Sequence, residues 1–226
     1  MAPSAKGARP LLSIGVMTAD WMHMGDELRR IESAGADFVH IDVMDGCFCP
    51  QLTIGPSVIA ALKTPLRKDV HLMIDEPLDK VRAYVDAGAS TVTFHVEATR
   101  HPHRVLQALG STVTRGVAIN PGTQVSAIEP LLDELELVLV LAVNPGWGGQ
   151  RFIPATERRL HQARELIERS GRGVKLAVDG GVTRENAGSI AAMGVDLIVA
   201  GSAVFDGGDA GANLESLLAG VRRGTA

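Results

Sequence analysis

The sequence has few cysteines, few aromatic residues and no long apolar run, and each shortage excludes a class of protein. Its two cysteines, Cys47 and Cys49, are separated by one residue, which is too close for a disulfide framework or a C-x-x-C redox motif. We therefore expect reduced thiols and a cytoplasmic location. No apolar stretch is long enough to cross a bilayer, and none precedes Leu11 as a secretory signal would require. The sequence thus predicts no membrane partner.

An excess of positive charge is also missing. The formal net charge is -4 at pH 7, and lysine and arginine form no block or stripe. A nucleic-acid backbone is bound by concentrated positive charge, so we expect no nucleic-acid partner. An anionic small molecule would have to be held by local groups such as backbone amides.

What the sequence does contain is a regular alternation of apolar runs and helix-like segments. At 226 residues it has room for one core, and we expect a flexible tail over residues 1–10 and one catalytic domain over residues 11–222. The predicted strands are Leu11–Met17, Phe38–Val43, Val70–Met73, Thr91–Val96, Val113–Ile119, Leu137–Val143, Val174–Val178 and Leu197–Ala200. Segments with helical spacing between them include Gly25–Ser33, Leu78–Ala87, Thr156–Ser170 and Arg184–Ala192. Strand and helix alternating in this way predict an α/β fold, a single (β/α)8 TIM barrel.

A weak internal repeat supports the barrel. Ser33-Ala-Gly-Ala-Asp37, Asp86-Ala-Gly-Ala-Ser90 and Ala192-Met-Gly-Val-Asp196 each precede a predicted strand. Each indicates a helix that ends at a glycine and turns directly into the next strand. A doubly wound open sheet is the alternative fold, and the lack of a G-x-G-x-x-G motif after the first strand disfavours it.

Four polar residues stand at the ends of predicted strands two, three and seven. His40 and Asp42 alternate along strand two and therefore share a face, while His71 and Asp179 belong to strands three and seven. Catalytic side chains in a barrel lie at the carboxyl ends of the strands. We expect these four residues to hold one divalent metal ion, with Zn²⁺ as the first choice and Fe²⁺, Mn²⁺ or Co²⁺ as alternatives.

The two carboxylates of this set also suit proton transfer. Asp42 and Asp179 come from strands that are far apart in order, so they could flank a substrate. One carboxylate could remove a proton from carbon on one face while the other returns a proton on the opposite face. The metal would stabilise the enediolate formed between the two transfers.

Glycine-rich segments after predicted strands six, seven and eight indicate a phosphate site. Barrels often hold phosphate with backbone amides of the last loops. The candidates for substrate and phosphate binding in these loops are Gly146, Trp147, Gly148, Gly149, Gly180, Gly181, Gly201 and Ser202. The loop over residues 145–150 could also form a lid that excludes water.

Other polar residues and methionines near the strand ends are weaker candidates for the site. Met44, Met73, His95 and Asn144 are candidates for supporting the ligands or the substrate. His95 shares a face with Glu97, and ordinary buried polarity explains that pair equally well. Lys175 starts strand seven, at the wrong end of the barrel for a Schiff base, and His101, His103 and His161 are expected at the surface.

Five motifs together resemble the ribulose-phosphate 3-epimerase family over Leu11 to Phe205. They are His40-Ile-Asp-Val-Met-Asp-Gly46, Asp69-Val-His-Leu-Met73, Asn144-Pro-Gly-Trp-Gly-Gly-Gln150, Val178-Asp-Gly-Gly-Val182 and Gly201-Ser-Ala-Val-Phe205. The resemblance implies a ribulose-phosphate-binding barrel and an isomerase that interconverts D-ribulose 5-phosphate and D-xylulose 5-phosphate in the pentose phosphate pathway or the Calvin cycle. It implies metal ligation by His40, Asp42, His71 and Asp179, base and acid roles for Asp42 and Asp179, and phosphate binding by the glycine loops. His71 is also expected near the substrate. A homo-oligomer, from dimer to hexamer, is expected as well.

The sequence departs from the family pattern at several positions. The family has a substrate-contacting serine where this chain has Gly15, and Ser13 lies two residues earlier as the candidate replacement. Leu141 replaces a customary methionine, Trp147 a phenylalanine and Ala177 a glutamate. These departures leave the sugar open, because a D-allulose 6-phosphate 3-epimerase would share the metal and the aspartate pair.

Two alternatives of other classes are weaker. A metal-dependent hydrolase on the same barrel would need a His-x-His pair on strand one, and Gly15-Val-Met17 carries none. A phosphate-binding protein without catalysis would need Asp42 or Asp179 to be lost, and both are present.

Overall fold

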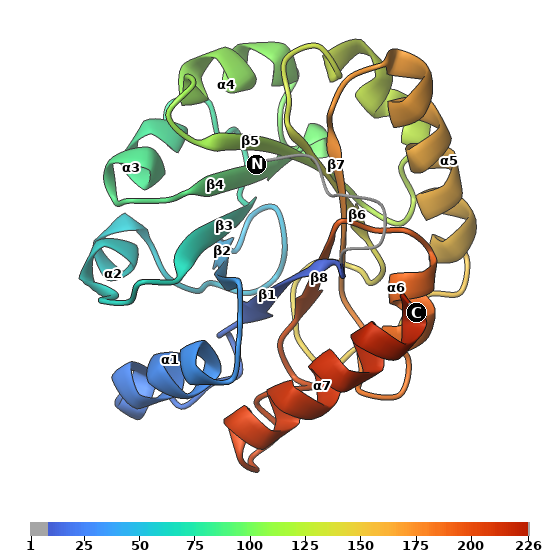
Figure 1. The fold of residues 1–226 in the computed structure, drawn as a ribbon. Coiled ribbons are helices and arrows are strands. Elements are labelled where there is room, and N and C mark those ends of the chain that lie inside the picture. Colours follow the sequence, from blue (N-terminus) through green and yellow to red (C-terminus); the bar gives the residue numbers. More distant parts are fainter. Residues whose placement is uncertain (1–8, 226) are drawn as a thin grey trace.

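Eight parallel strands close into a barrel with helices around the outside, in a computed structural model that describes residues 9–225 (Figure 1). The strands pair in chain order from first to last, and the first pairs with the eighth. They are β1 (Leu11–Gly15), β2 (Phe38–Met44), β3 (Arg67–Met73), β4 (Thr91–His95), β5 (Thr114–Ile119), β6 (Leu137–Leu141), β7 (Lys175–Asp179) and β8 (Leu197–Ala200). The predicted TIM barrel and all eight predicted strands are confirmed.

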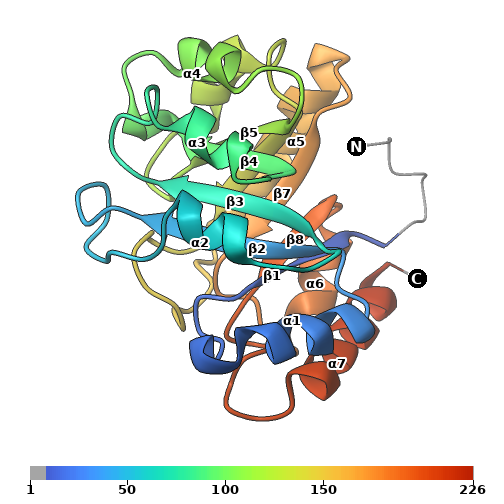
Figure 2. The same ribbon diagram turned by 90° about the vertical axis from the view of Figure 1, so that its left-hand side faces the viewer.

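The helices pack on the outer surface of this barrel. The α-helices are α1 (Met24–Ser33), α2 (Pro56–Ala61), α3 (Val81–Asp86), α4 (Pro102–Leu109), α5 (Thr156–Ser170), α6 (Ala187–Ala192) and α7 (Ala210–Gly224). The 3-10 helices are η1 (Trp21–His23), η2 (Val96–Ala98) and η3 (Val125–Leu131). The last helix, α7, lies beside both α1 and α6, so the two ends of the described chain meet on one side of the barrel (Figure 2).

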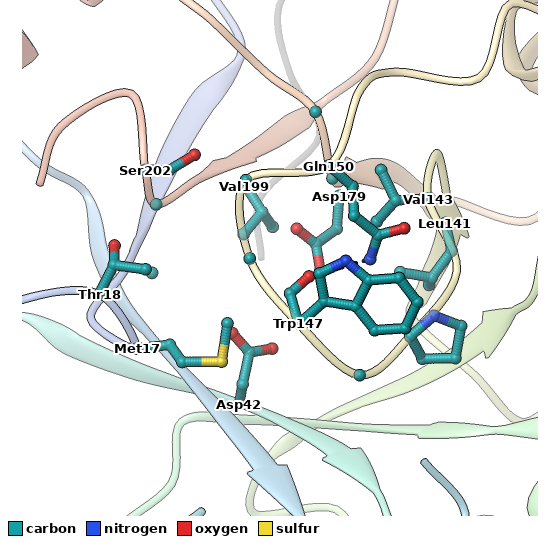
Figure 3. A pocket seen from close by; sticks show the side chains of 18 of the residues that line it. Met17, Thr18, Asp42, Leu141, Val143, Trp147, Gln150, Asp179, Val199 and Ser202 are labelled. Carbon is teal, nitrogen blue, oxygen red and sulfur yellow. Dashed lines mark hydrogen bonds between the residues drawn. The ribbon is translucent and has the colours of Figure 1, made fainter. Parts of the chain in front are cut away.

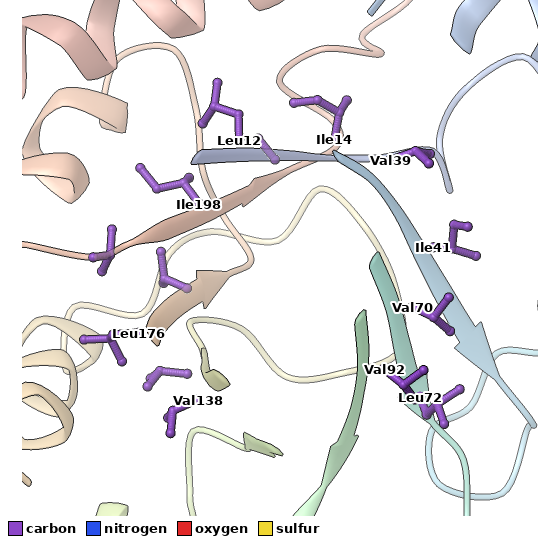
Figure 4. Packing of buried hydrophobic residues seen from close by; sticks show 14 of the residues in the cluster. Leu12, Ile14, Val39, Ile41, Val70, Leu72, Val92, Val138, Leu176 and Ile198 are labelled. Carbon is purple, nitrogen blue, oxygen red and sulfur yellow. The ribbon is translucent and has the colours of Figure 1, made fainter. Parts of the chain in front are cut away.

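Alternation along each strand sorts its residues between two environments. Apolar residues such as Leu12, Ile14, Val39 and Ile41 point outward and pack against the helices (Figure 4). This layer between strands and helices is the main hydrophobic core, in which most members are completely buried. Burying a leucine or isoleucine side chain contributes about 1.5–3 kcal/mol, so this layer holds the barrel together.

The residues that point into the barrel are divided by character. Strands β5 to β8 supply mainly apolar residues, including Ala118, Leu139, Ala177 and Val199. Strands β1 to β4 supply apolar residues such as Phe38 at the amino-terminal end, but they also supply a group of buried polar residues: Ser13, His40, Asp69, His71, Thr93 and His95. Polar groups buried in this way must bind one another or a ligand to offset their lost hydration. One side of the barrel interior is therefore built as a polar site.

The register between β2 and β3 sets the neighbours within this polar half. His40 lies beside Asp69, and Asp42 lies beside His71 one step further along the same face. The remaining candidate ligand, Asp179, ends β7 at the same edge of the barrel. The candidate ligands thus meet because of strand register and not because of a special loop.

The glycines of the internal repeat end their helices as predicted. Gly35, Gly88 and Gly194 follow α1, α3 and α6 with positive φ values of 97°, 91° and 75°. A side chain is strained in this conformation, so glycine suits each turn into the next strand. The predicted short connections are confirmed.

Two details differ from the predicted organisation. The connection between β5 and β6 is the 3-10 helix η3, because in an α-helix the ring of Pro130 would clash with the carbonyl four residues earlier. Residues 1–8, most of the predicted tail, lie outside the described part of the chain. The last two residues of the predicted tail pack against the barrel, since Arg9 pairs with Asp37 at 2.8 Å and Pro10 is buried. No described helix has the length and apolar character that a membrane crossing requires.

Candidate metal-binding active site

Four side chains converge at the carboxyl edge of the barrel. Nε2 of His40 lies 3.3 Å from Oδ1 of Asp42 and 3.8 Å from Oδ2 of Asp179. Nδ1 of His71 lies 3.3 Å and 3.5 Å from the same two oxygens. All four ligand atoms lie within 4.8 Å of one another. The structure therefore brings together the complete metal-ligating set predicted from the sequence.

The spacing and the donor types fit a metal ion. Ligand atoms placed 2.0–2.2 Å from a tetrahedral zinc ion stand about 3.4 Å apart, which is close to the distances found here. Nε2 of His40 is buried and has no hydrogen-bond partner among the described residues, although it faces both carboxylates. Such an orphaned nitrogen is costly unless a ligand satisfies it. Imidazole and carboxylate donors suit zinc and neighbouring divalent metals.

The carboxylates give the cluster a negative electrostatic field, which favours a bound positive charge, either a proton on an imidazole or a metal cation. Burial opposes ionisation of Asp42, but His40 and His71 beside it hold the pKa of its carboxyl below the ordinary range. Burial also lowers the pKa of His40, yet the charges of Asp42 and Asp69 raise it well above its usual value. The aspartate therefore stays ionised, which is the form that binds metal.

His40 is held from behind by a buried carboxylate that was not among the predicted site residues. Oδ2 of Asp69 lies 2.8 Å from Nδ1 of His40 and accepts a 2.7 Å hydrogen bond from the hydroxyl of Ser13. A carboxylate behind a ligating histidine fixes its tautomer and ring orientation. Strand alternation could have revealed Asp69, because it lies two residues before His71 and shares its face.

His71 is held by a different partner. Its Nε2 lies 2.9 Å from Nε2 of His95, whose Nδ1 lies 3.3 Å from Oε2 of Glu97. Burial lowers the pKa of His95 to about 4 despite the neighbouring carboxylate. Burial opposes ionisation of Glu97, but hydrogen bonds from His95, Thr123 and Asn120 lower its pKa to about 2. The supporting place predicted for His95 is consistent with these contacts.

A cavity opens above the cluster, and both aspartates point into it (Figure 3). The predicted residues that line it are Asp42, Met44, Met73, Asn144, Gly146, Trp147, Gly148, Gly149, Asp179, Gly180, Gly181, Gly201 and Ser202. Leu141 and Met17 line it as well. A ligand in this cavity would touch both carboxylates and the glycine loops at once.

The glycines after β7 and β8 are required by close packing. Gly181 has a φ of 66°, and a Cβ on it would lie 2.3 Å from the backbone nitrogen of Phe152. A Cβ on Gly201 would lie 3.1 Å from the carbonyl oxygen of Gly15. Glycine therefore keeps these two loops packed against the neighbouring backbone at the rim of the cavity.

The loop after β6 covers one side of the cavity. The side-chain amide of Gln150 donates to the carbonyls of Asn144 at 2.6 Å and Trp147 at 2.9 Å, which ties the loop to itself. The indole of Trp147 stands over the cavity and is half exposed (Figure 3). This arrangement is consistent with the lid predicted over residues 145–150.

Two predicted substrate contacts lie away from the cavity surface. Ser13 is completely buried, and its hydroxyl is bound to Asp69, while Gly15 lines the cavity instead. The side chain of His71 is completely buried beneath the aspartates. Strand alternation explains both positions, because Ser13 points into the barrel below Gly15 and His71 below Met73.

The residues assigned away from the site also lie where expected. Lys175 pairs with Asp196 at 3.2 Å at the amino-terminal end of the strands, and His101, His103 and His161 are exposed. Cys47 and Cys49 are free thiols in the loop after β2, the first exposed and the second buried. A further buried residue, Arg159 of α5, was not predicted because arginine is usually exposed, although its helical spacing places it on the same face as Ala163 and Leu166.

Comparison with known proteins identifies the family. The model of the ribulose-phosphate 3 epimerase family matches residues 11–205. The chain belongs to this family. A ribulose-phosphate 3-epimerase of Rhodobacter capsulatus is 47% identical over 197 residues, which is 85% of this chain and 85% of that protein. The ribulose-phosphate 3-epimerase of Escherichia coli strain K12 is 43% identical over 203 residues, with 87% and 89% of the two chains covered.

A plant member extends the match. The chloroplastic ribulose-5-phosphate-3-epimerase of Arabidopsis thaliana is 41% identical over 217 residues, which is 94% of this chain and 77% of that protein. Bacterial and chloroplast members of the family are thus about equally similar to this chain. The family resemblance predicted from the five motifs is confirmed.

Solved structures with low identity share the fold. KGPDC from Streptococcus mutans superimposes with a TM-score of 0.70 at 15% identity, covering 96% of this chain and 99% of that one. Tryptophan synthase from Mycobacterium tuberculosis gives a TM-score of 0.67 at 16% identity, with 96% and 94% covered. At such identity the likeness concerns the barrel alone.

Proposed function

We propose that this family member is a metal-dependent 3-epimerase that interconverts D-ribulose 5-phosphate and D-xylulose 5-phosphate. The observation that carries the proposal is the placing of Asp42 and Asp179 at one cavity rimmed by glycine loops. The curated relatives at 41–47% identity bear the corresponding name. Epimerisation at C3 requires removal of a proton beside the ketone and its return to the opposite face, so two acid/base groups are needed.

The two aspartates have the accessibility that this chemistry requires. Their side chains are 13% and 18% exposed, whereas those of His40 and His71 are 1% and 0% exposed. Only the carboxylates of the cluster can therefore reach a C–H bond of a substrate in the cavity. We assign proton removal and return to Asp42 and Asp179, with their roles exchanged when the reaction runs in the other direction.

The cluster of His40, Asp42, His71 and Asp179 would hold one divalent metal, with zinc as the first choice. When bound, this cation would supply positive charge next to the substrate oxygens on which negative charge develops as the proton leaves. The residues beneath do the positioning, since Asp69 orients His40 and His95 orients His71.

The phosphate of the substrate would lie against the rim formed after β7 and β8. Gly180, Gly181, Gly201 and Ser202 line the cavity there, and their backbone amides suit an anion in a chain with no basic stripe. The loop over residues 145–150 would then close over the sugar and exclude water. A cytoplasmic homo-oligomer acting in the pentose phosphate pathway or the Calvin cycle stays a prediction.

Measurement of kcat/KM for D-ribulose 5-phosphate and D-allulose 6-phosphate tests the assignment of the sugar. We expect the pentose phosphate to be the better substrate of the metal-supplemented protein. Preference for the hexose phosphate would overturn the pentose assignment but would leave the proposed epimerisation at C3 unaffected. Absence of epimerisation with both sugars in the presence of Zn²⁺, Fe²⁺, Mn²⁺ or Co²⁺ would overturn the proposed function.

A further inference from the structure

The two histidines of the metal cluster are supported by chemically different partners. Nδ1 of His40 faces the carboxylate of Asp69, whereas Nε2 of His71 faces a second imidazole, that of His95. An ionised carboxylate can only accept a hydrogen bond, so it fixes the tautomer of His40 by itself. An imidazole nitrogen can donate or accept. The support of His71 therefore depends on what holds His95.

The contacts of His71 and His95 determine which ring nitrogen of each imidazole carries the proton. His71 faces Asp42 and Asp179 through Nδ1, so binding a metal through that atom leaves its proton on Nε2. Nε2 of His95, 2.9 Å away, must then accept that proton. A neutral His95 consequently carries its own proton on Nδ1. This Nδ1 is buried and has no hydrogen-bond partner of normal geometry among the described residues, and the acceptor nearest to hand is Oε2 of Glu97 at 3.3 Å.

Glu97 is itself held so that one oxygen stays free for this task. Its Oε1 accepts hydrogen bonds from the backbone N–H of Asn120, at 2.7 Å, and from the hydroxyl of Thr123. Arg159 secures the same loop from the other side, donating to the carbonyl of Asn120 at 2.6 Å and that of Thr123 at 3.2 Å. With Oε1 committed to the loop, Oε2 is turned toward His95.

We propose that Glu97 is a positioning residue that acts through His95 to keep the metal-facing nitrogen of His71 free of a proton. The inference rests on the proposed function only in taking the four-residue cluster as a metal site. It assigns a role in metal binding to a glutamate that does not line the cavity. Through His95 and Glu97, a continuous series of polar contacts joins the cluster to the loop between β5 and η3.

Substitution Glu97→Gln tests the proposal with almost no change of shape. The amide oxygen of the new side chain must take the place of Oε1, because a backbone N–H and a hydroxyl donate to that position. The amide NH2 group then faces Nδ1 of His95 and favours the tautomer with its proton on Nε2. That tautomer opposes the Nε2 proton of His71 and drives it to the metal-facing Nδ1. We expect zinc affinity to fall about 10–100-fold.

Substitution His95→Gln removes the relay while keeping an acceptor near the place of Nε2. The carbonyl oxygen of this glutamine can accept from His71 whatever stands at position 97. Glu97→Gln should therefore weaken zinc binding in the wild-type background and change it less than about twofold in the His95→Gln background, as a double-mutant cycle reports. Glu136→Gln is the matched control, since Glu136 also accepts from a backbone N–H, that of Arg115 at 2.8 Å, but at the amino-terminal end of the strands.

Zinc affinities of the four variants and the wild type would be measured by competition with a chromophoric chelator, independently of turnover. Wild-type affinity in Glu97→Gln, or an equal loss in both backgrounds, would overturn the proposal alone. A wild-type protein that binds no divalent metal would overturn the metal site as well. Long-range ¹H–¹⁵N spectra of the zinc-loaded wild type provide a test that needs no variant: the proton of His95 is expected on Nδ1, and a proton on Nε2 would contradict the proposal.

Discussion

At the scale of single residues, the site has two groups of side chains: those that can contact a substrate and those that hold the first group in place. The aspartates Asp42 and Asp179 line the cavity, whereas the histidines, Asp69 and Ser13 lie beneath it. Residues at the surface of the cavity act on the substrate, and those beneath decide how firmly the surface residues are held. Substitutions in the two groups should therefore change different kinetic constants.

Ser13→Ala distinguishes a substrate contact from a support. Because the hydroxyl of Ser13 is buried and donates to Asp69, we expect the variant to leave KM for the sugar phosphate within about twofold of wild type. The loss of one buried hydrogen bond, about 0.5–1.5 kcal/mol, should instead weaken zinc binding several-fold. Steady-state kinetics at saturating zinc and a zinc titration measure the two effects. A large rise in KM with unchanged zinc affinity would restore Ser13 as a substrate contact.

Asp179→Asn removes one of the two proton-transfer groups and keeps its shape. We expect kcat to fall by at least about 100-fold, because general acid/base catalysis contributes about 10²–10⁴-fold. The circular dichroism spectrum should match that of the wild type, since Asp179 ends β7 at the rim and not in the core. Near-normal turnover by the folded, zinc-loaded variant would show that the two-carboxylate scheme is wrong.

Site residues whose positions depend on the strand pattern can be predicted from the sequence, whereas those whose positions depend on packing between elements cannot. His40, Asp42, His71 and Asp179 were recognisable because strand alternation and strand ends place them at one rim. Asp69 followed the same alternation but stands next to a clearer candidate. The role of Arg159 could not be predicted, because its contacts with the carbonyls of Leu141 and Asn120 depend on how α5 lies against the barrel.

At the scale of elements, the loops after β7 and β8 owe their shape to glycine. Gly181→Ala should be strongly unfavourable, since its φ is 66° and the added Cβ would meet the backbone of Phe152. We expect KM for the sugar phosphate to rise at least about tenfold, or the melting temperature to fall, as the loop shifts away. Gly122→Ala is the control, because its φ is not positive and no atom lies within 4 Å of the added Cβ. Equal behaviour of the two variants would contradict this account of the loop.

The opposite end of the barrel is closed by acidic residues that bind the preceding strands. Asp37 accepts from the N–H of Leu12, Glu136 from that of Arg115 and Asp196 from that of Leu176. These acids stand just before β2, β6 and β8. Two of them belong to the internal repeat, which revealed the helix ends but gave no sign of this hydrogen bonding.

Asp196 makes part of the stability dependent on pH. Burial opposes its ionisation, but the N–H of Leu176 and the charges of Arg164 and Lys175 hold its pKa below the ordinary value. A lowered folded-state pKa means that this contribution is present above the unfolded-state pKa, about 4, and is lost as pH falls through the folded-state value. We expect Asp196→Asn to lower the free energy of unfolding at pH 7 by about 1–3 kcal/mol.

Urea unfolding between pH 7 and pH 3 measures this effect. The difference between the wild type and Asp196→Asn should shrink as the pH falls below about 4, because the carboxyl of the wild type becomes protonated. A difference that stays constant over the whole range would show that the charge of Asp196 does not stabilise the fold.

At the scale of the whole molecule, the barrel followed from strand count, strand order and alternation. What the sequence did not show is the division of the barrel interior into an apolar half from β5 to β8 and a polar half from β1 to β4. That division depends on which residues are lateral neighbours, as His40 and Asp69 are, and the register that creates such pairs is a property of the closed barrel. It concentrates the buried polar groups under one cavity, where a metal and a substrate would satisfy them.

The central claim is that the two carboxylates move a proton at C3 of a ketose phosphate. Proton NMR of the zinc-supplemented protein with D-ribulose 5-phosphate in D2O tests this claim most directly. We predict D-xylulose 5-phosphate with deuterium from solvent at C3. Product that keeps the original proton at C3, or no product and no exchange, would contradict the proposed chemistry.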